Sequence, residues 1–201
     1  MNIIRRSLVW LRRIGYCKGF HVQSPTDYWF ICHVINEQFP YYAYSDLQNK
    51  RAVNDIIELK LCRLLFRISN FVQSSVCVDF SSLSSNSALY IKAGSKKTRI
   101  VSFSDVISNN NEHYSIADIE SLDMVHIALP NDQFTYIYEL MDKVNDSSVF
   151  IIEGIYYNKE TRCAWSELLN DERVRISYDL YYCGILFFDS NRYKQNYKVN
   201  F

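Results

Sequence analysis

The chain has 201 residues, of which 48% are hydrophobic and 22% are charged, a balance that suits one globular domain with a sizeable core. The formal net charge is zero, which excludes a chain that is basic or acidic throughout. The charge is nevertheless uneven, because residues 1–70 carry a net charge of +5 and residues 71–201 carry −5. The basic front could touch nucleic acid or anionic lipid, but we expect it to dock on the acidic remainder of the same fold.

The first fifteen residues, MNIIRRSLVWLRRIG, are basic and partly apolar. Arg pairs interrupt the apolar runs, so the segment lacks the continuous apolar stretch of a signal peptide and is too short to span a bilayer. Ile4, Leu8 and Leu11 share one helical face. We therefore expect a surface helix that packs on the body, no contact with a membrane, and a cytoplasmic protein.

Three segments follow before the first strand. Ser24, Pro25 and Asp27 have the spacing of a helix start, with a cap, a proline in the first turn and an early acid. The stretch YYAYSDL is expected to be a connector. Residues 54–70 repeat apolar residues at helical spacing. Residues 1–70 are thus predicted to form a helical N-terminal extension packed on the body.

From residue 71 the pattern alternates between strands and helices, which implies an α/β domain with a mostly parallel sheet and helices on both faces. The predicted strands are VCVDF, TRIVSFSD, a weak HYSIAD, DMVHIAL, SVFIIEG, VRISYDL and CGILFF, and the predicted helices are SALYIKA, NDQFTYIYELMDKV and KETRCAWSELL. The last strands follow one another without a helix, which predicts a C-terminal antiparallel hairpin. YKVNF is expected to add a strand paired to CGILFF.

This arrangement resembles the Rossmann-like fold of class I S-adenosylmethionine-dependent methyltransferases. KGFHVQSPTDYWFICHVI resembles an N-terminal signature of a bacterial methyltransferase-like family, roughly HGxGVHSPFVxxLIxxVI. LCRLLFRISNFVQSSVCVDF is similar to that family's LLFRLVNYxxPxxILELG. VFIIEGIYYNKETRCAWSELLNDERVRISYDLYYCGILFF is similar to its VFIxDDIHWSxEMxxAWxxIxxHPxVxxTIDLFxxGIxFF. The likeness spans nearly the whole chain.

The resemblance assigns six residues to a cofactor site, and the sequence departs from the family around them. Asp79 keeps the acid after the first strand, but Ser81 and Ser85 stand where the family has glycines that let the backbone approach the cofactor. Asp105 is placed where the family acid holds the ribose, and Asp118 where it meets the adenine. The helix expected after Asp105 is replaced by the short, polar VISNNNEHYS.

The acids that hold a metal in related O-methyltransferases are also reduced. Ala128 ends one strand in place of an acid, and the family's paired acids after the next strand become Glu153 and Gly154. Glu153 is the sixth predicted cofactor-site residue. One remaining acid makes an octahedral oxygen site implausible, so no metal is expected. His126 lies within an apolar strand, and we expect a hydrogen-bonded core histidine there.

Three functions remain open from the sequence. The first is a methyltransferase-fold protein with a degenerate S-adenosylmethionine site and a non-catalytic binding or assembly role. The second is an active S-adenosylmethionine-dependent methyltransferase whose remodelled loop serves a small-molecule substrate. The third, a nucleic-acid-associated protein using the basic N-terminal residues, is not favoured because no stacking motif accompanies them. A small-molecule ligand and a homo-oligomer are both compatible with the sequence.

Overall fold

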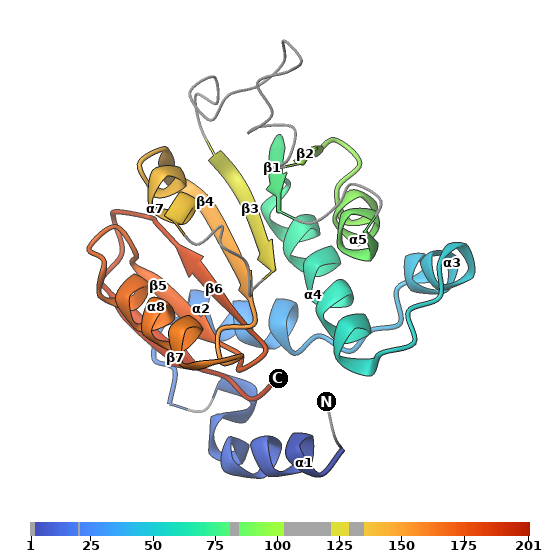
Figure 1. Ribbon diagram of the computed structural model, residues 1–201, viewed down its shortest axis with the longest axis horizontal. Coiled ribbons are helices and arrows are strands. Elements are labelled where there is room, and N and C mark those ends of the chain that lie inside the picture. Colours follow the sequence, from blue (N-terminus) through green and yellow to red (C-terminus); the bar gives the residue numbers. More distant parts are fainter. Residues whose placement is uncertain (1–2, 20, 81–84, 103–121, 129–134) are drawn as a thin grey trace.

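The computed structural model describes residues 3–19, 21–80, 85–102, 122–128 and 135–201, and its described strands form one sheet (Figure 1). The sheet order is β2-β1-β3-β4-β6-β5-β7. The strands are β1 (Val76–Asp79), β2 (Arg99–Ser102), β3 (Leu122–Ala128), β4 (Val144–Glu153), β5 (Ile176–Asp179), β6 (Cys183–Phe187) and β7 (Gln195–Lys198). All neighbouring pairs are parallel except those that involve β6, which is antiparallel to both β4 and β5. The predicted mostly parallel sheet with a C-terminal antiparallel hairpin is confirmed.

The last strand differs from the expectation. β7 does not pair with β6, because β4 and β5 already occupy both edges of that strand. It pairs instead with β5 in parallel register, with Ile176 opposite Gln195 and Asp179 opposite Lys198. The prediction that YKVNF pairs with CGILFF was therefore wrong, since the free sheet edge belonged to β5. The predicted strand HYSIAD and the segment VISNNNEHYS lie outside the described residues.

Helices cover both faces of the sheet, as the sequence predicts. The described helices are α1 (Ile3–Arg12), η1 (Ile14–Gly19), α2 (Pro25–Phe30), η2 (Ile31–Ile35), α3 (Tyr42–Lys50), α4 (Ile56–Val72), α5 (Asn86–Gly94), α7 (Thr135–Met141) and α8 (Lys159–Asn170). On one face, α2, η2, α4 and α5 contribute to a core with Cys77, Met124 and Ile151 from the strands. On the other, α7 and α8 pack against Val78 and Phe150. The N-terminal helices share their core with the sheet, and the division of the chain near residue 70 stays a prediction.

The stretch YYAYSDL, expected to be a connector, begins the helix α3. Polar residues on its outer face obscure the apolar spacing of a helix. Tyr44 and Leu47 nevertheless point inward and are 8% and 6% exposed. They pack with Phe66 of α4 and Tyr90 of α5 in a third apolar cluster. The contact is non-local, so helical spacing within the short segment did not reveal it.

Asp27 fixes the N-terminal helices to the last strands. Ser24 Oγ accepts the backbone N–H of Asp27 at 3.3 Å, as the predicted cap requires. The carboxylate of Asp27 is buried and accepts hydrogen bonds from Tyr178 at 2.5 Å, Arg192 at 2.7 Å and Tyr197 at 3.0 Å. Burial favours the neutral acid, but the hydrogen bonds from Tyr178 and Arg192 outweigh it and hold the pKa of Asp27 below its usual 3.8.

Candidate functional site

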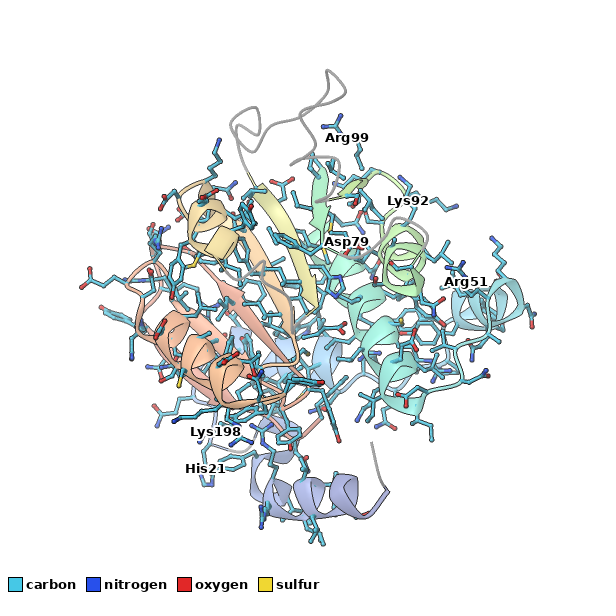
Figure 2. All side chains as sticks on the ribbon, viewed as in Figure 1. His21, Arg51, Asp79, Lys92, Arg99 and Lys198 are labelled. Carbon is cyan, nitrogen blue, oxygen red and sulfur yellow. The ribbon has the colours of Figure 1, made fainter. Side chains whose placement is uncertain are left out.

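The carboxyl ends of β1, β3 and β4 meet at one edge of the sheet, where ligands of open α/β sheets usually bind. The strand register places Asp79 opposite His126, and Ala128 opposite Glu153. Side chains two residues apart point to the same face of a strand. Asp79, His126 and Glu153 therefore all lie on the face that α4 covers, and Figure 2 shows Asp79 in the interior of the molecule.

His126 joins the two carboxylates. Its Nδ1 lies 2.9 Å from Oδ1 of Asp79, and its Nε2 lies 3.0 Å from Oε1 of Glu153. His126 is 1% exposed and Asp79 is fully buried, whereas the Glu153 side chain keeps 23% exposure. The prediction of a hydrogen-bonded core histidine is confirmed, and its partners are two of the predicted cofactor residues.

The two carboxylates favour the imidazolium form of His126. Burial by itself lowers the pKa of His126, but the hydrogen bonds and negative charges of Asp79 and Glu153 outweigh it and raise the pKa to about 10. Both ring N–H groups then donate, one to each carboxylate. In this form one positive charge lies between two carboxylates and neutralises part of their negative charge.

Ser85 serves the helix that follows it. Its Oγ accepts the N–H of Ala88 at 3.2 Å and lies 2.7 Å from Oγ of Ser87, which makes it the N-cap of α5. Ser81, Asp105 and Asp118 lie outside the described residues, so of the six predicted site residues the structure brings together Asp79 and Glu153 and adds His126 between them.

Gly154 explains why only one acid follows β4. Its φ of 75° lies in the left-handed region that favours glycine, and its N–H donates to the carbonyl of Tyr182 at 2.7 Å. The tight turn thus occupies the position where the resembling family has a second acid. Among the described residues, no group of three or more His, Cys, Asp or Glu side chains could hold a metal ion.

A second polar cluster, which was not predicted from the sequence, lies at the carboxyl end of β5. Asp179 accepts Arg13 Nη2 at 2.7 Å, the hydroxyl of Tyr156 at 2.7 Å and the N–H of Tyr181 at 2.9 Å. The rings of Tyr156 and Tyr181 are stacked with centroids 5.2 Å apart. The sequence around Asp179 indicates only the end of a strand, because its partner Arg13 lies 166 positions away.

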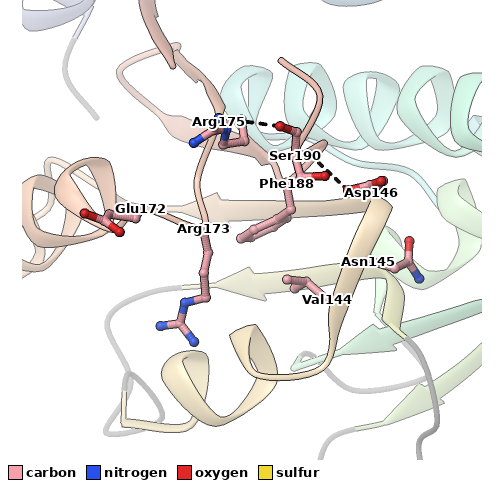
Figure 3. A pocket seen from close by; sticks show the side chains of 8 residues that line it. All are labelled: Val144, Asn145, Asp146, Glu172, Arg173, Arg175, Phe188 and Ser190. Carbon is pink, nitrogen blue, oxygen red and sulfur yellow. Dashed lines mark hydrogen bonds between the residues drawn. The ribbon is translucent and has the colours of Figure 1, made fainter. Parts of the chain in front are cut away.

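A shallow cleft of about 330 Å³ opens at the opposite end of the sheet, where β4 begins (Figure 3). Its arginines already have partners: Arg173 binds Asp171 at 2.7 Å and also pairs with Asp142, and Arg175 donates to the carbonyl of Arg192 at 2.9 Å. The cleft is far along the strands from Asp79 and Glu153, and its arginines are bound to neighbouring residues.

Comparison with known proteins identifies the fold. No protein-family model and no curated protein sequence matches the chain. Among solved structures, the S-adenosylhomocysteine-bound Podospora anserina methyltransferase PaMTH1 matches with a TM-score of 0.53 and 10% identity, over 88% of this chain and 97% of that one. A methyltransferase from Geobacter sulfurreducens matches with a TM-score of 0.48 and 12% identity, over 79% and 95% of the two chains. The chain has a class I methyltransferase-like, Rossmann-like α/β fold.

Proposed function

We propose that this protein is a methyltransferase-fold protein whose S-adenosylmethionine site is degenerate and that it acts as a non-catalytic binding or assembly partner. One observation carries the proposal: His126 binds both Asp79 and Glu153. These are the acids at the carboxyl edge that the family resemblance assigns to the cofactor. A side chain from the intervening strand now binds one oxygen of each acid.

The chemistry of the cofactor makes this arrangement unfavourable. S-adenosylmethionine carries a sulfonium and an ammonium, and a site that holds it benefits from free carboxylates. Here a buried imidazolium already neutralises part of the negative charge of the two carboxylates, which weakens their attraction for another cation. The segment from Ser81 to Asn86 contains no glycine, so the close backbone approach typical of such sites is also disfavoured. The residues at this edge of the sheet therefore do not fit S-adenosylmethionine well.

Calorimetric titration of the full chain with S-adenosylmethionine and S-adenosylhomocysteine tests the proposal. We expect no binding tighter than roughly 100 μM, about −5.5 kcal/mol. A cooperative thermal transition of the same sample is the control for folding. Saturable binding below that concentration would overturn the proposal.

Two variants separate the reasons for weak binding. Ser81→Gly/Ser85→Gly removes loop side chains, and His126→Asn removes the imidazolium and releases both acids. If the histidine is the cause, only His126→Asn gains affinity for S-adenosylmethionine. A gain confined to the glycine variant would place the obstruction in the loop and remove His126 from the explanation.

The second candidate is an active S-adenosylmethionine-dependent methyltransferase acting on a small molecule. The partial exposure of Glu153 favours it, because a carboxylate that reaches solvent at the carboxyl edge can orient an acceptor hydroxyl. Methyl transfer to a candidate hydroxylated acceptor that is lost in Glu153→Gln but kept in Glu160→Gln, an acid on α8, would support it.

A further inference from the structure

The helix α1 exposes its apolar side to solvent. Leu8, Trp10, Leu11 and Ile14 are between 50% and 57% exposed, whereas Arg13 on the opposite side is 9% exposed. A helix on the surface of a globular protein normally does the reverse and buries its apolar stripe. The expectation that Leu8 and Leu11 pack on the body was wrong.

Contacts on the basic side explain this orientation. Arg13 Nη2 donates to Oδ1 of Asp179 at 2.7 Å and to its backbone carbonyl at 3.2 Å. Asn200 donates from its side chain to the carbonyl of Trp10 at 3.3 Å and from its backbone to that of Tyr16 at 3.1 Å. These bonds attach the end of α1 to β5 and to the C-terminal segment. The rest of α1 extends along the outside of the molecule (Figure 1).

The charged residues of the N-terminal segment are all positive. The first 26 residues contain Arg5, Arg6, Arg12, Arg13 and Lys18 and no Asp or Glu. In an α-helix, residues advance by about 100° each, so Leu8 and Leu11 fall on one side, with the exposed Arg12 next to them. A helix with an apolar stripe, a tryptophan and flanking arginines has the composition of an interfacial membrane helix.

We propose that α1 binds in the plane of an anionic lipid surface, with Leu8, Trp10, Leu11 and Ile14 inserted below the headgroups. Basic residues near such a surface are attracted by its negative potential. Within the part of the chain that the structure describes, no helix is both long and apolar enough to cross a bilayer, so the helix lies on the surface. The inference is independent of whether the cofactor site is functional.

Two other occupants fit the same observations less well. A second copy of the chain would bring two segments of charge +5 together, which opposes pairing through this face. A nucleic acid would use the arginines but would leave Leu8, Trp10 and Leu11 in water. An anionic lipid layer satisfies both the charge and the apolar side chains.

Vesicle sedimentation of the full chain tests the inference. The vesicles are phosphatidylcholine alone, or phosphatidylcholine with about one quarter phosphatidylglycerol. We expect sedimentation with the anionic vesicles, little with the neutral ones, and a decrease as salt rises from about 50 to about 500 mM. Leu8→Gln/Leu11→Gln should weaken binding by at least about tenfold, because two leucines no longer enter the apolar layer.

A matched control removes apolar surface elsewhere. Phe39 and Ile56 are 72% and 60% exposed and lie outside α1, so Phe39→Gln/Ile56→Gln should bind vesicles like the unchanged chain. Trp10 adds a spectroscopic measure, since its emission should shift to the blue with anionic vesicles and Trp10→Phe should abolish the shift.

Three results would overturn the inference. Equal sedimentation with neutral and anionic vesicles would remove the role of charge. A dimer in analytical ultracentrifugation that Leu8→Gln/Leu11→Gln dissociates would assign the face to a second copy. Retention on RNA that Leu8→Gln/Leu11→Gln leaves unchanged, without vesicle binding, would assign the segment to nucleic acid.

Discussion

His126 lies between two carboxylates on neighbouring strands, and its protonation is coupled to the stability of the fold. In the unfolded chain its pKa is near 6.5, and in the folded chain it is about 10. A group whose pKa is raised by folding stabilises the protein fully below the unfolded value, and this contribution is lost as pH rises toward the folded value. In the lower part of this pH range, cysteine thiols and tyrosine phenols with ordinary pKa values do not titrate.

The first prediction follows from this coupling. Between about pH 6 and about pH 8.5 we expect the free energy of unfolding to fall with rising pH, approaching about 1.4 kcal/mol per pH unit from this group. His126→Gln should lose about 3–5 kcal/mol at pH 6, because two carboxylates are left without their cation, and should lose the part of the slope that the histidine causes. Urea denaturation at each pH measures both effects.

His33→Gln is the matched control, because His33 is an exposed histidine. It should keep the pH dependence of the unchanged chain. A His126→Gln variant with the same slope as the unchanged chain would show that another group causes it.

Among the secondary-structure elements, α8 and β6 make a close contact between Trp165 and Gly184. A Cβ added to Gly184 in β6 would lie 2.2 Å from a ring carbon of Trp165 in α8. Trp165 is 3% exposed and belongs to the core on that face. The absence of a side chain at Gly184 therefore lets the indole of Trp165 pack directly against the strand.

The second prediction concerns this contact. Gly184→Ala should lower the free energy of unfolding by about 1–3 kcal/mol, because the large ring cannot move without displacing the core. Gly15→Ala should change stability little, since a Cβ there meets no heavy atom within 4 Å. Equilibrium denaturation of the two variants checks the difference, and equal midpoints would contradict the argument.

For the whole molecule, one core extends from the N-terminal helices to the last strands. Phe30, Ile31 and Ile35 are at most 3% exposed and share a cluster with Tyr178 and Ile185. Asp27 adds buried hydrogen bonds to β5 and β7. The part from residue 71 onward would expose this apolar face if it stood alone.

The third prediction tests that dependence. A chain beginning at residue 71 should show no cooperative thermal transition, because α2, η2 and α4 no longer cover the sheet. A chain beginning at residue 21, which keeps these helices, should retain one with a lower midpoint. Circular dichroism follows both, and a cooperative transition in the shorter chain would show that residues 71–201 fold alone.

Most of the local elements and the fold class could be predicted from the residue pattern. Apolar periodicity identified the described strands from VCVDF to CGILFF and the described helices between them, because side-chain spacing along a segment indicates which face is buried. The mostly parallel sheet and its closing hairpin follow from the order of those elements. The cap at Ser24 and the core position of His126 were also readable from neighbouring residues.

The contacts between distant groups could not be predicted from the residue pattern. The partners of His126, the pairing of β7 with β5 and the inward face of α3 depend on contacts between residues far apart in the chain. The outward apolar face of α1 depends on the buried ion pair between Arg13 and Asp179 and on the hydrogen bonds from Asn200. Periodicity shows that a helix has an apolar side, but the bonds available on the rest of the molecule decide where that side points.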